Sequence, residues 1–388
     1  MPQGLASADW RIWAAGGASL LVVVAAFVLL RRRGRSPRER EFEAYVQAVQ
    51  ALSSDDLDAA ILALTAAAEL NSACTSTYLA LGKLLRRKGE VDRALRIHYN
   101  LSIRPDLPID VRLDSQLERA IDELAAGRPK EALATVAGVL AAKRKDSRAL
   151  EVAAEAHLRL SQWEEAYEAF RRLDRATGQP RPVLLAHLLA ARGRQLASEG
   201  NLPAAKKILQ KALGVDAQSV DALIALGDAY LVEKKARRAI ETWEQIFEID
   251  LRWVEILVPR LEQAFFALGE VDRMEGLLRR QVSRRPGDAR LHLVLARHQE
   301  KKRRIEDALG GLKEALDLDP RNLSLRRERG RLALERAEGL DLANEFKALL
   351  GALPEDPPPL RCSACGAAYA EPTWRCETCR AWGTVRFN

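Results

Sequence analysis

The chain has 388 residues, which is long for one compact core and favours several domains or an elongated repeat array. Aromatic residues make up only 5% of it, whereas Ala, Leu, Arg and Glu dominate, as is typical of all-α arrays rather than of sheet proteins. The formal net charge is +7, but the segment 31–40, RRRGRSPRER, contributes +5 through six Arg and one Glu. Because the rest of the chain is close to neutral, we expect no nucleic acid among its partners.

The first predicted element is an apolar helix over residues 13–30, WAAGGASLLVVVAAFVLL, which carries no charge. Its 18 residues would span roughly 27 Å at about 1.5 Å per residue, enough to cross a bilayer core. The Arg cluster follows the run, whereas a cleaved signal peptide carries its positive charge before it. The alternative is a buried core helix. The pattern favours a transmembrane helix, with residues 1–12 outside and the basic juxtamembrane segment 31–40 in the cytoplasm, beside anionic lipid headgroups.

Residues 41–350 repeat a helical phrase at steps of 34 to 39 residues. Each copy is typical of the second helix of a helical hairpin, with a small or apolar residue where the two helices cross. The crossing residues are Ala60, Ala94, Ala132, Ala166, Ala205, Ala239, Met274 and Ala308. This period predicts a tetratricopeptide-repeat superhelix, in which stacked hairpins share a core and form a concave groove for peptides or protein segments.

Other features of the array lead to more local predictions. Two steps are longer than the rest, and we expect their extra residues, within 104–116 and 175–185, in connecting loops. Pro286 and Pro320 are predicted to end second helices. Five basic residues fall at groove-facing offsets and are candidates for holding an acidic partner segment, the alternative being ordinary solvated helix faces. They are Lys83, Arg86, Arg87, Arg194 and Arg297.

The array shows no catalytic constellation. Its five histidines form no HExxH, and the chain has neither GxxxxGK[ST] nor GxSxG. His98 occupies a repeat position that normally packs, and the isolated Cys74 is interpreted as a small buried apolar residue. We therefore predict a protein that is not an enzyme and has no catalytic residues.

The segment 361–388 is predicted to be a metal-binding module, joined to the array by the Pro-rich linker 351–360. Cys362 and Cys365 form one CxxC pair, and Cys376 and Cys379 form another after ten residues. Two such turns close a tetrahedron for one zinc ion or for the single iron of a rubredoxin, and the choice of metal stays open. Disulfides are the alternative, but a cytosolic location disfavours them. We expect three aromatic residues to form the small hydrophobic cover of the module: Tyr369, Trp374 and Trp382.

The combination of anchor, array and ribbon resembles the lipopolysaccharide assembly protein B family of Gram-negative inner-membrane proteins. The similarity is sharpest in GEVDRALRIH (89–98) and WRCETCRAW (374–382). The resemblance implies that residues 1–12 are periplasmic, that the array and C-terminus are cytoplasmic, and that the four cysteines form a rubredoxin-like module packed on the repeats.

The resemblance also implies a function as an adaptor. Family members bring the lipid A pathway deacetylase LpxC to the membrane AAA+ protease FtsH, which limits lipopolysaccharide synthesis. They also respond to an inner-membrane partner that senses lipopolysaccharide. The sequence leaves two alternatives open, a general scaffold for envelope assembly enzymes and rubredoxin-type electron transfer. It also leaves open whether the chain forms a homo-oligomer.

Overall fold

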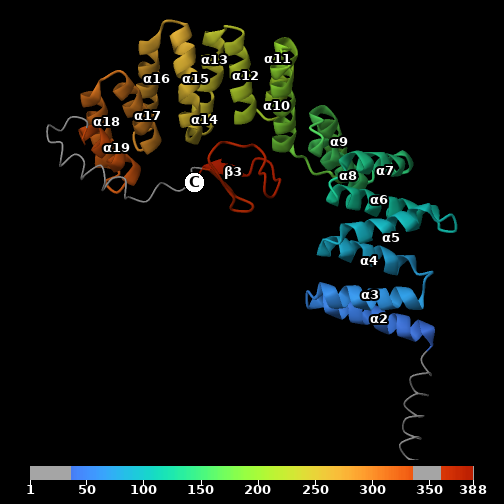
Figure 1. Ribbon diagram of the computed structural model, residues 1–388. Helices are drawn as coiled ribbons and strands as arrows, with labels where there is room; N and C mark the ends of the chain where they lie inside the picture. Colours follow the sequence, from blue (N-terminus) through green and yellow to red (C-terminus); the bar gives the residue numbers. More distant parts are fainter. Residues whose placement is uncertain (1–35, 335–359, 388) are drawn as a thin grey trace, which may run out of the picture. The chain divides into compact units, whose positions relative to one another are not determined.

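The computed structural model describes residues 36–334 and 360–387 (Figure 1). The predicted membrane helix 13–30 and residues 351–359 of the predicted linker lie outside these ranges. Within them, no helix combines the length and apolar character that crossing a membrane requires. The chain divides after Gln162 into two compact units.

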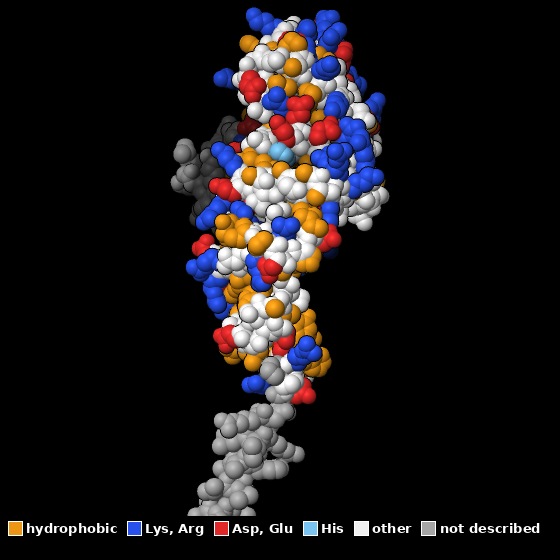
Figure 2. Space-filling view, turned by 90° about the vertical axis from the view of Figure 1, so that its right-hand side faces the viewer, with side chains coloured by type: hydrophobic (Ala, Val, Ile, Leu, Met, Phe, Trp, Pro, Cys, Tyr) orange, Lys and Arg blue, Asp and Glu red, His pale blue; other side chains and the backbone are white. Residues whose placement is uncertain are grey.

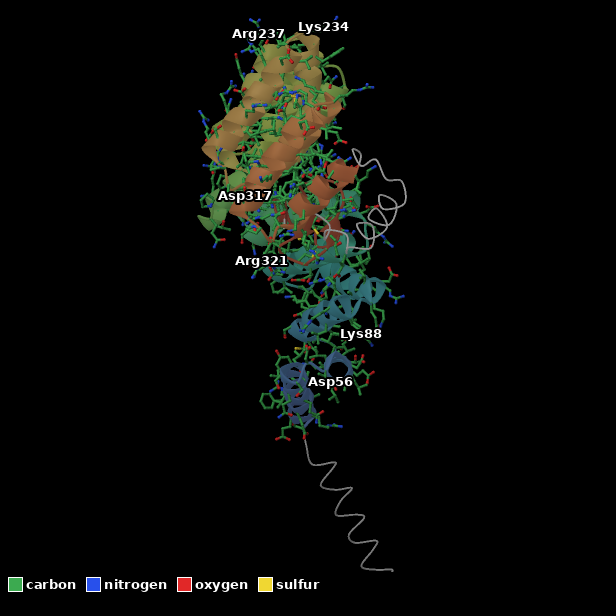
Figure 3. The ribbon with its side chains drawn as sticks, turned by 90° about the vertical axis from the view of Figure 1, so that its left-hand side faces the viewer. Asp56, Lys88, Lys234, Arg237, Asp317 and Arg321 are labelled. Carbon is green, nitrogen blue, oxygen red and sulfur yellow. The ribbon has the colours of Figure 1, made fainter. Side chains whose placement is uncertain are left out.

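The first unit is formed by consecutive antiparallel helices, in which each helix packs on the next (Figure 1). Its helices are α2 (Pro37–Ser53), α3 (Leu57–Leu70), α4 (Thr75–Lys88), α5 (Val91–Ile103), α6 (Ile109–Ala125), α7 (Pro129–Ala142) and α8 (Ser147–Arg159). Several of these helices have a polar N-cap residue. Ser36 forms a capping box with Glu39 at the start of α2, and Asp56 accepts a hydrogen bond from the Ala59 amide at the start of α3. Asp56 and Lys88 lie at hairpin ends (Figure 3).

The second unit continues the same pattern and adds a small sheet. Its helices are α9 (Trp163–Thr177), α10 (Pro182–Ser198), α11 (Leu202–Val215), α12 (Val220–Val232), α13 (Ala236–Glu244), α14 (Ile246–Ile249), the 3₁₀ turn η1 (Leu251–Trp253), α15 (Val254–Ala267), α16 (Val271–Arg284), α17 (Ala289–Lys301), α18 (Ile305–Leu318) and α19 (Leu323–Leu334). Three short strands follow: β1 (Leu360–Cys362), β2 (Ala368–Tyr369) and β3 (Val385–Phe387).

The eight predicted crossing residues are all buried, and each is at most 1% exposed. Three glycines on first helices, Gly82, Gly193 and Gly227, lie close against a side chain of the following helix. A Cβ on Gly82 would lie 2.4 Å from Nε2 of His98, and one on Gly227 would lie 2.1 Å from Nε1 of Trp243. Both distances are far below normal contact, so these positions require glycine in the structure as packed. The predicted tetratricopeptide-repeat fold is confirmed for the described helices.

The extra residues of the two long steps were predicted in connecting loops, and this prediction was wrong for most of them. Helices α6 and α10 have 17 residues each, whereas α4 has 14, so three of the extra residues in each step extend the first helix rather than a loop. Pro108 is the N-cap residue of α6, without a side-chain capping hydrogen bond, and Pro182 opens α10 at a position favourable for proline. Neither helix contains a further proline after this position, and each is almost one turn longer than α4.

The remaining local predictions have mixed outcomes. Helices α16 and α18 end at Arg284 and Leu318, two residues before Pro286 and Pro320, as predicted. His98 is fully buried as a packing residue. Cys74 is half-buried rather than buried, because it occupies the N-cap position of α4, at the edge of the hairpin.

Candidate metal centre

The cysteine ribbon is built on the three-stranded antiparallel sheet, in the order β2-β1-β3. Strand β1 pairs Leu360 with Tyr369 of β2 on one side and with Phe387 of β3 on the other. Leu360 and Val385 are buried with Cys362 and Cys376 in the ribbon's small core. This sheet fixes Cys362 at the end of its central strand.

Two similar turns present the four cysteines. In the first turn the amide of Gly366 donates to the carbonyl oxygen of Cys362 at 2.8 Å, and in the second the amide of Arg380 donates to that of Cys376 at 2.8 Å. The residue after each pair has a positive φ, 76° at Gly366 and 61° at Arg380. Glycine adopts this conformation without strain, whereas arginine does so at a cost. The two turns are therefore matched in geometry but not in sequence.

The four sulfur atoms converge on one point. They all lie within 4.8 Å of one another, with 3.6 Å between Sγ of Cys362 and Cys379 and 3.5 Å between Sγ of Cys365 and Cys376. A tetrahedral ion with metal–sulfur bonds of about 2.3 Å would place its sulfurs about 3.8 Å apart. All four cysteines are free thiols. The predicted set is thus brought together with the spacing that a zinc or iron ion requires.

Hydrogen bonds to sulfur favour the thiolate form that a metal needs. The Tyr369 hydroxyl accepts from the Glu377 amide at 2.9 Å and lies 3.0 Å from Sγ of Cys376, to which it can donate. Burial acts to raise the pKa of Cys376, but the Cys379 amide and the Tyr369 hydroxyl outweigh it and lower that pKa to about 5. The Thr384 hydroxyl similarly lowers the pKa of Cys362. The pKa values of Cys365 and Cys379 are instead raised: hydrogen bonds from backbone amides act to lower them, but burial and the neighbouring cysteine side chains outweigh these. The convergence of the four sulfurs is what fits a closed four-sulfur site.

Aromatic side chains dock the ribbon on helices of the second unit. Trp374 stacks on Trp253 of η1 with ring centroids 4.5 Å apart, and Trp382 meets Trp163 of α9 edge-on at 6.3 Å. Phe387 adds an edge contact with Trp253 at 5.1 Å, and its carbonyl accepts from Nη1 of Arg252 at 3.3 Å. Such contacts bury large apolar areas in specific geometries.

His187 of α10 lies between the two ribbon tryptophans. Its ring is 5.4 Å from that of Trp374 and 5.9 Å from that of Trp382. Nδ1 of His187 lies 2.9 Å from Oδ2 of the buried Asp221, which also pairs with Arg194. Asp221 therefore orients the histidine against the ribbon.

These contacts correct the predicted role of two tryptophans. Tyr369 packs in the ribbon's core beside the cysteines as expected. Trp374 and Trp382 pack on aromatic side chains of the helices instead, because the ribbon's small core is already filled by its strands and cysteines. Their partners Trp163, His187 and Trp253 were not singled out from sequence. Nothing in their local pattern distinguishes them from ordinary packing residues.

The five predicted partner-binding residues all form ion pairs within the chain. In the first unit, Lys83 lies 3.1 Å from Glu118, Arg86 lies 2.8 Å from Glu118 and 2.6 Å from Asp122, and Arg87 lies 2.8 Å from Asp55. In the second unit, Arg194 pairs with Asp221, and Arg297 lies 3.5 Å from Glu328. Basic and acidic side chains are also interspersed on the face drawn in Figure 2. An acidic ligand would have to compete with these carboxylates.

Comparison with known proteins matches both parts of the chain. Residues 361–386 match the family described as rubredoxin metal binding domain, and residues 45–108, 117–180 and 190–248 match the tetratricopeptide repeat. Lipopolysaccharide assembly protein B of Escherichia coli K12 is 25% identical over 375 residues, covering 95% of this chain and 96% of that protein. The protein of the same name from Haemophilus influenzae Rd is 26% identical over 312 residues, covering 79% of this chain and 78% of its own length.

Solved structures with similar helices have low overall agreement. A tetratricopeptide repeat protein from Parabacteroides merdae has a TM-score of 0.37 and 16% identity, covering 75% of this chain and 98% of its own. The ribbon and repeat matches, together with similarity over 95% and 79% of the chain to the two relatives, make this chain a homologue of lipopolysaccharide assembly protein B, with tetratricopeptide repeats and a rubredoxin-like ribbon.

Proposed function

We propose that this protein is a non-enzymatic inner-membrane adaptor that limits lipopolysaccharide synthesis by presenting the deacetylase LpxC to the membrane protease FtsH. The observation that carries the proposal is the docked ribbon: a four-cysteine module held by Trp374 and Trp382 on a tetratricopeptide array, in a homologue of lipopolysaccharide assembly protein B. Such arrays bind protein segments and have no chemistry of their own.

The apolar run 13–30 would supply the membrane anchor, and the Arg residues of 31–40 would hold the array on the cytoplasmic side. This arrangement places the array beside a membrane protease and leaves it accessible to a cytosolic substrate. Other lipopolysaccharide assembly or sensing proteins in the same membrane are further proposed partners, and pairing between anchors would allow a homo-oligomer.

One zinc or iron ion is proposed as the cofactor, held by Cys362, Cys365, Cys376 and Cys379. Four sulfur ligands fill a tetrahedral site, so the ion would stabilise the ribbon rather than bind substrate. Its binding free energy, on the order of 10 kcal/mol in small zinc peptides, would supply folding energy that so small a core lacks.

Deacetylase turnover tests the adaptor proposal. We expect the half-life of LpxC to lengthen severalfold when this protein is depleted and to return to normal with the wild-type chain. Cys376→Ser should unfold the ribbon and fail to restore turnover, while the helical circular dichroism signal persists. An LpxC half-life that does not change on depletion would exclude this adaptor function and favour the general scaffold, whose partners crosslinking in membranes would identify.

Electron transfer is the second candidate, because Cys365 and Cys379 are exposed and would bring a redox ion close to the surface. It requires iron, since zinc has no accessible redox change. Purified protein with an iron ribbon would be red and would lose colour reversibly on reduction. Protein that contains only zinc would exclude this function.

A further inference from the structure

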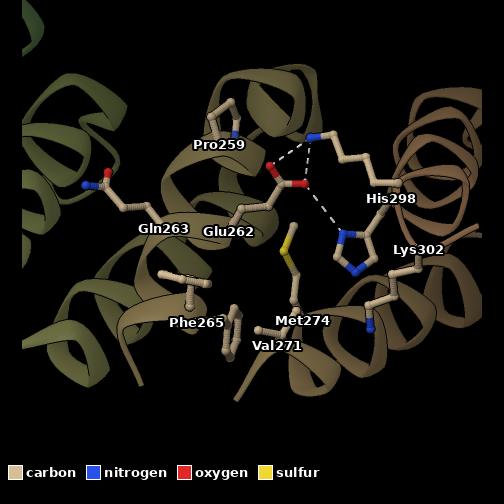
Figure 4. Close-up of a pocket in the computed structure, with 10 residues that line it drawn as sticks. Pro259, Glu262, Gln263, Phe265, Val271, Met274, His298 and Lys302 are labelled. Carbon is tan, nitrogen blue, oxygen red and sulfur yellow. Dashed lines mark hydrogen bonds and ion pairs between the residues drawn. The ribbon is translucent and has the colours of Figure 1, made fainter. Parts of the chain in front are cut away.

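A cavity of about 490 Å³ opens on the second unit, between α15, α16 and α17 (Figure 4). One side is apolar and includes Phe265, Val271 and Met274. Phe266 at its rim is 77% exposed. Covering a large exposed aromatic side chain removes apolar area from water, so its position beside a cavity is typical of an interaction site. The volume falls within the range of roughly 300–1,000 Å³ typical of ligand sites.

His298 forms the polar end of the cavity and is only 5% exposed. Within the described residues, neither ring nitrogen has a hydrogen-bond partner of good geometry. Nδ1 faces the Glu262 carboxylate at 3.5 Å (Figure 4). A buried polar group without a partner costs roughly 1–3 kcal/mol, so a ligand that satisfies it gains affinity.

The protonation of His298 indicates what such a ligand must offer. Burial lowers the pKa of His298, and the Lys302 charge acts in the same direction, against the Glu262 carboxylate. The neutral ring carries one proton, and the carboxylate beside Nδ1 favours that nitrogen. Nε2 is then an acceptor, and it needs a hydrogen-bond donor.

Charges around the cavity are already paired. Nζ of Lys301 lies 2.8 Å from both carboxylate oxygens of Glu262, and Nζ of Lys302 lies 2.8 Å from Asp272. A charged ligand would have to break one of these pairs, whereas a neutral donor leaves both intact. The cavity therefore selects against acidic and basic side chains.

We propose that this cavity binds a Trp or Tyr side chain presented by a segment of a partner protein. The aromatic ring would pack on Phe266 and Val271, beside the buried Met274, and its N–H or O–H would donate to Nε2 of His298. This inference rests on the proposed adaptor function only for the partner's role, since the chemistry of the cavity is independent of the partner's name.

We assign a Trp occupant to a partner protein, because the tryptophans in the described part of this chain are engaged elsewhere. Trp243 is fully buried in the core of the second unit, and Trp163, Trp253, Trp374 and Trp382 pack in the ribbon contact. Trp10 and Trp13 precede or begin the predicted membrane run.

Methionine labelling gives a direct test, because the chain contains only Met1 and Met274. The full chain in detergent, with ¹³C-labelled methionine methyl groups, is titrated with N-acetyl amides of Trp, Tyr and Phe. We expect a saturable ring-current shift of the Met274 signal, with Trp and Tyr binding about 5–10-fold more tightly than Phe, because Phe lacks the donor. No shift of Met274, or Phe binding as tightly as Tyr, would overturn the proposal.

Variants locate the site. Phe266→Ala should weaken all three amides, whereas Phe42→Ala, which removes another exposed Phe in the first unit, should change none. His298→Leu should abolish the preference for Trp and Tyr over Phe, and His298→Gln, which keeps an acceptor, should restore part of it. Equal weakening by Phe42→Ala would contradict the assignment. If His298→Leu fails to fold, the wild-type comparison and Phe266→Ala still decide. These titrations need no protease or deacetylase, so their failure is distinct from failure of the adaptor proposal.

Discussion

Buried carboxylates in the first unit show how single residues hold the array together. Glu118 is 1% exposed, and three basic residues reach it: Lys83, Arg86 and Arg148. Asp122, also buried, pairs with Arg86 and lies 2.5 Å from Nδ1 of His98. A charge removed from water is tolerated only when it is paired and hydrogen-bonded, so these residues depend on one another.

Removing Arg86 should therefore cost much more stability than removing its neighbour. We expect Arg86→Met to lower the free energy of unfolding by about 2–4 kcal/mol, because it leaves two buried carboxylates short of a partner. Arg87 pairs with the exposed Asp55, so Arg87→Met should cost less than about 1 kcal/mol. Urea unfolding of both variants checks this. Similar losses of unfolding free energy would mean that the buried ion pairs stabilise the fold no more than the exposed one does.

The same network predicts a loss of stability in acid. Burial acts to raise the pKa of Glu118, but Arg148, Arg86 and Lys83 outweigh it and lower that pKa to about 2. Between pH values of about 2 and 4.5, the Glu118 carboxylate is therefore ionised in the folded state but protonated in the unfolded chain. Its contribution, up to about 3 kcal/mol, is complete above about pH 5 and is lost as pH falls towards 2. Unfolding midpoints between pH 6 and 3 should therefore fall more steeply for wild type than for Glu118→Gln, and parallel curves would contradict this assignment.

At the scale of elements, the hairpins were predictable because their signal is local and repeated. A small or apolar residue recurs at the predicted crossing point, and all eight such residues are buried. The extra turns of α6 and α10 were not predictable, because a longer period does not reveal whether a loop or a helix has grown. The ribbon's cysteines were predictable from spacing alone. Its contacts were not, because Trp163, His187 and Trp253 come together only when the hairpins stack.

Two glycines, one packed against a neighbouring helix and one on an open helix face, should respond to alanine substitution with opposite signs. Gly227→Ala should destabilise the second unit by about 1–3 kcal/mol, because its Cβ would meet the fully buried Trp243 ring. Gly276 lies inside α16 with no atom within 4 Å of an added Cβ. Gly276→Ala should therefore stabilise by up to about 1 kcal/mol through helix propensity. Thermal melting followed by circular dichroism checks the opposite signs, and a neutral Gly227→Ala would show that this crossing can widen.

At the scale of the whole molecule, the second unit combines two features on one array. The ribbon docks on α9, α10 and η1, and the proposed aromatic site lies on α15, α16 and α17. The proposed adaptor function requires binding one protein while being held near another, and separate surfaces on one scaffold would provide for this. The ribbon can then act through its position on the helices rather than through the chemistry of its metal.

Separating docking from metal binding tests this view of the ribbon. Trp374→Ala removes the stack on Trp253 but leaves all four cysteines and Tyr369 in place. We expect it to retain one metal ion per chain, measured by elemental analysis, because the sulfur ligands and their hydrogen bonds lie within the ribbon. Under the proposed adaptor function, it should nevertheless lengthen the half-life of LpxC, as we expect for Cys376→Ser, since an undocked ribbon no longer completes the array's surface.

The exposed Glu371→Ala on the same ribbon is the matched control and should change neither measurement. Normal LpxC turnover in Trp374→Ala would show that docking is dispensable and that the metal site acts in some other way. Loss of the metal in Trp374→Ala would show instead that the helices help to hold the ion, because the ribbon's own contacts would then be insufficient. Retained metal with slowed turnover is the combination that only a docked, structural ribbon predicts.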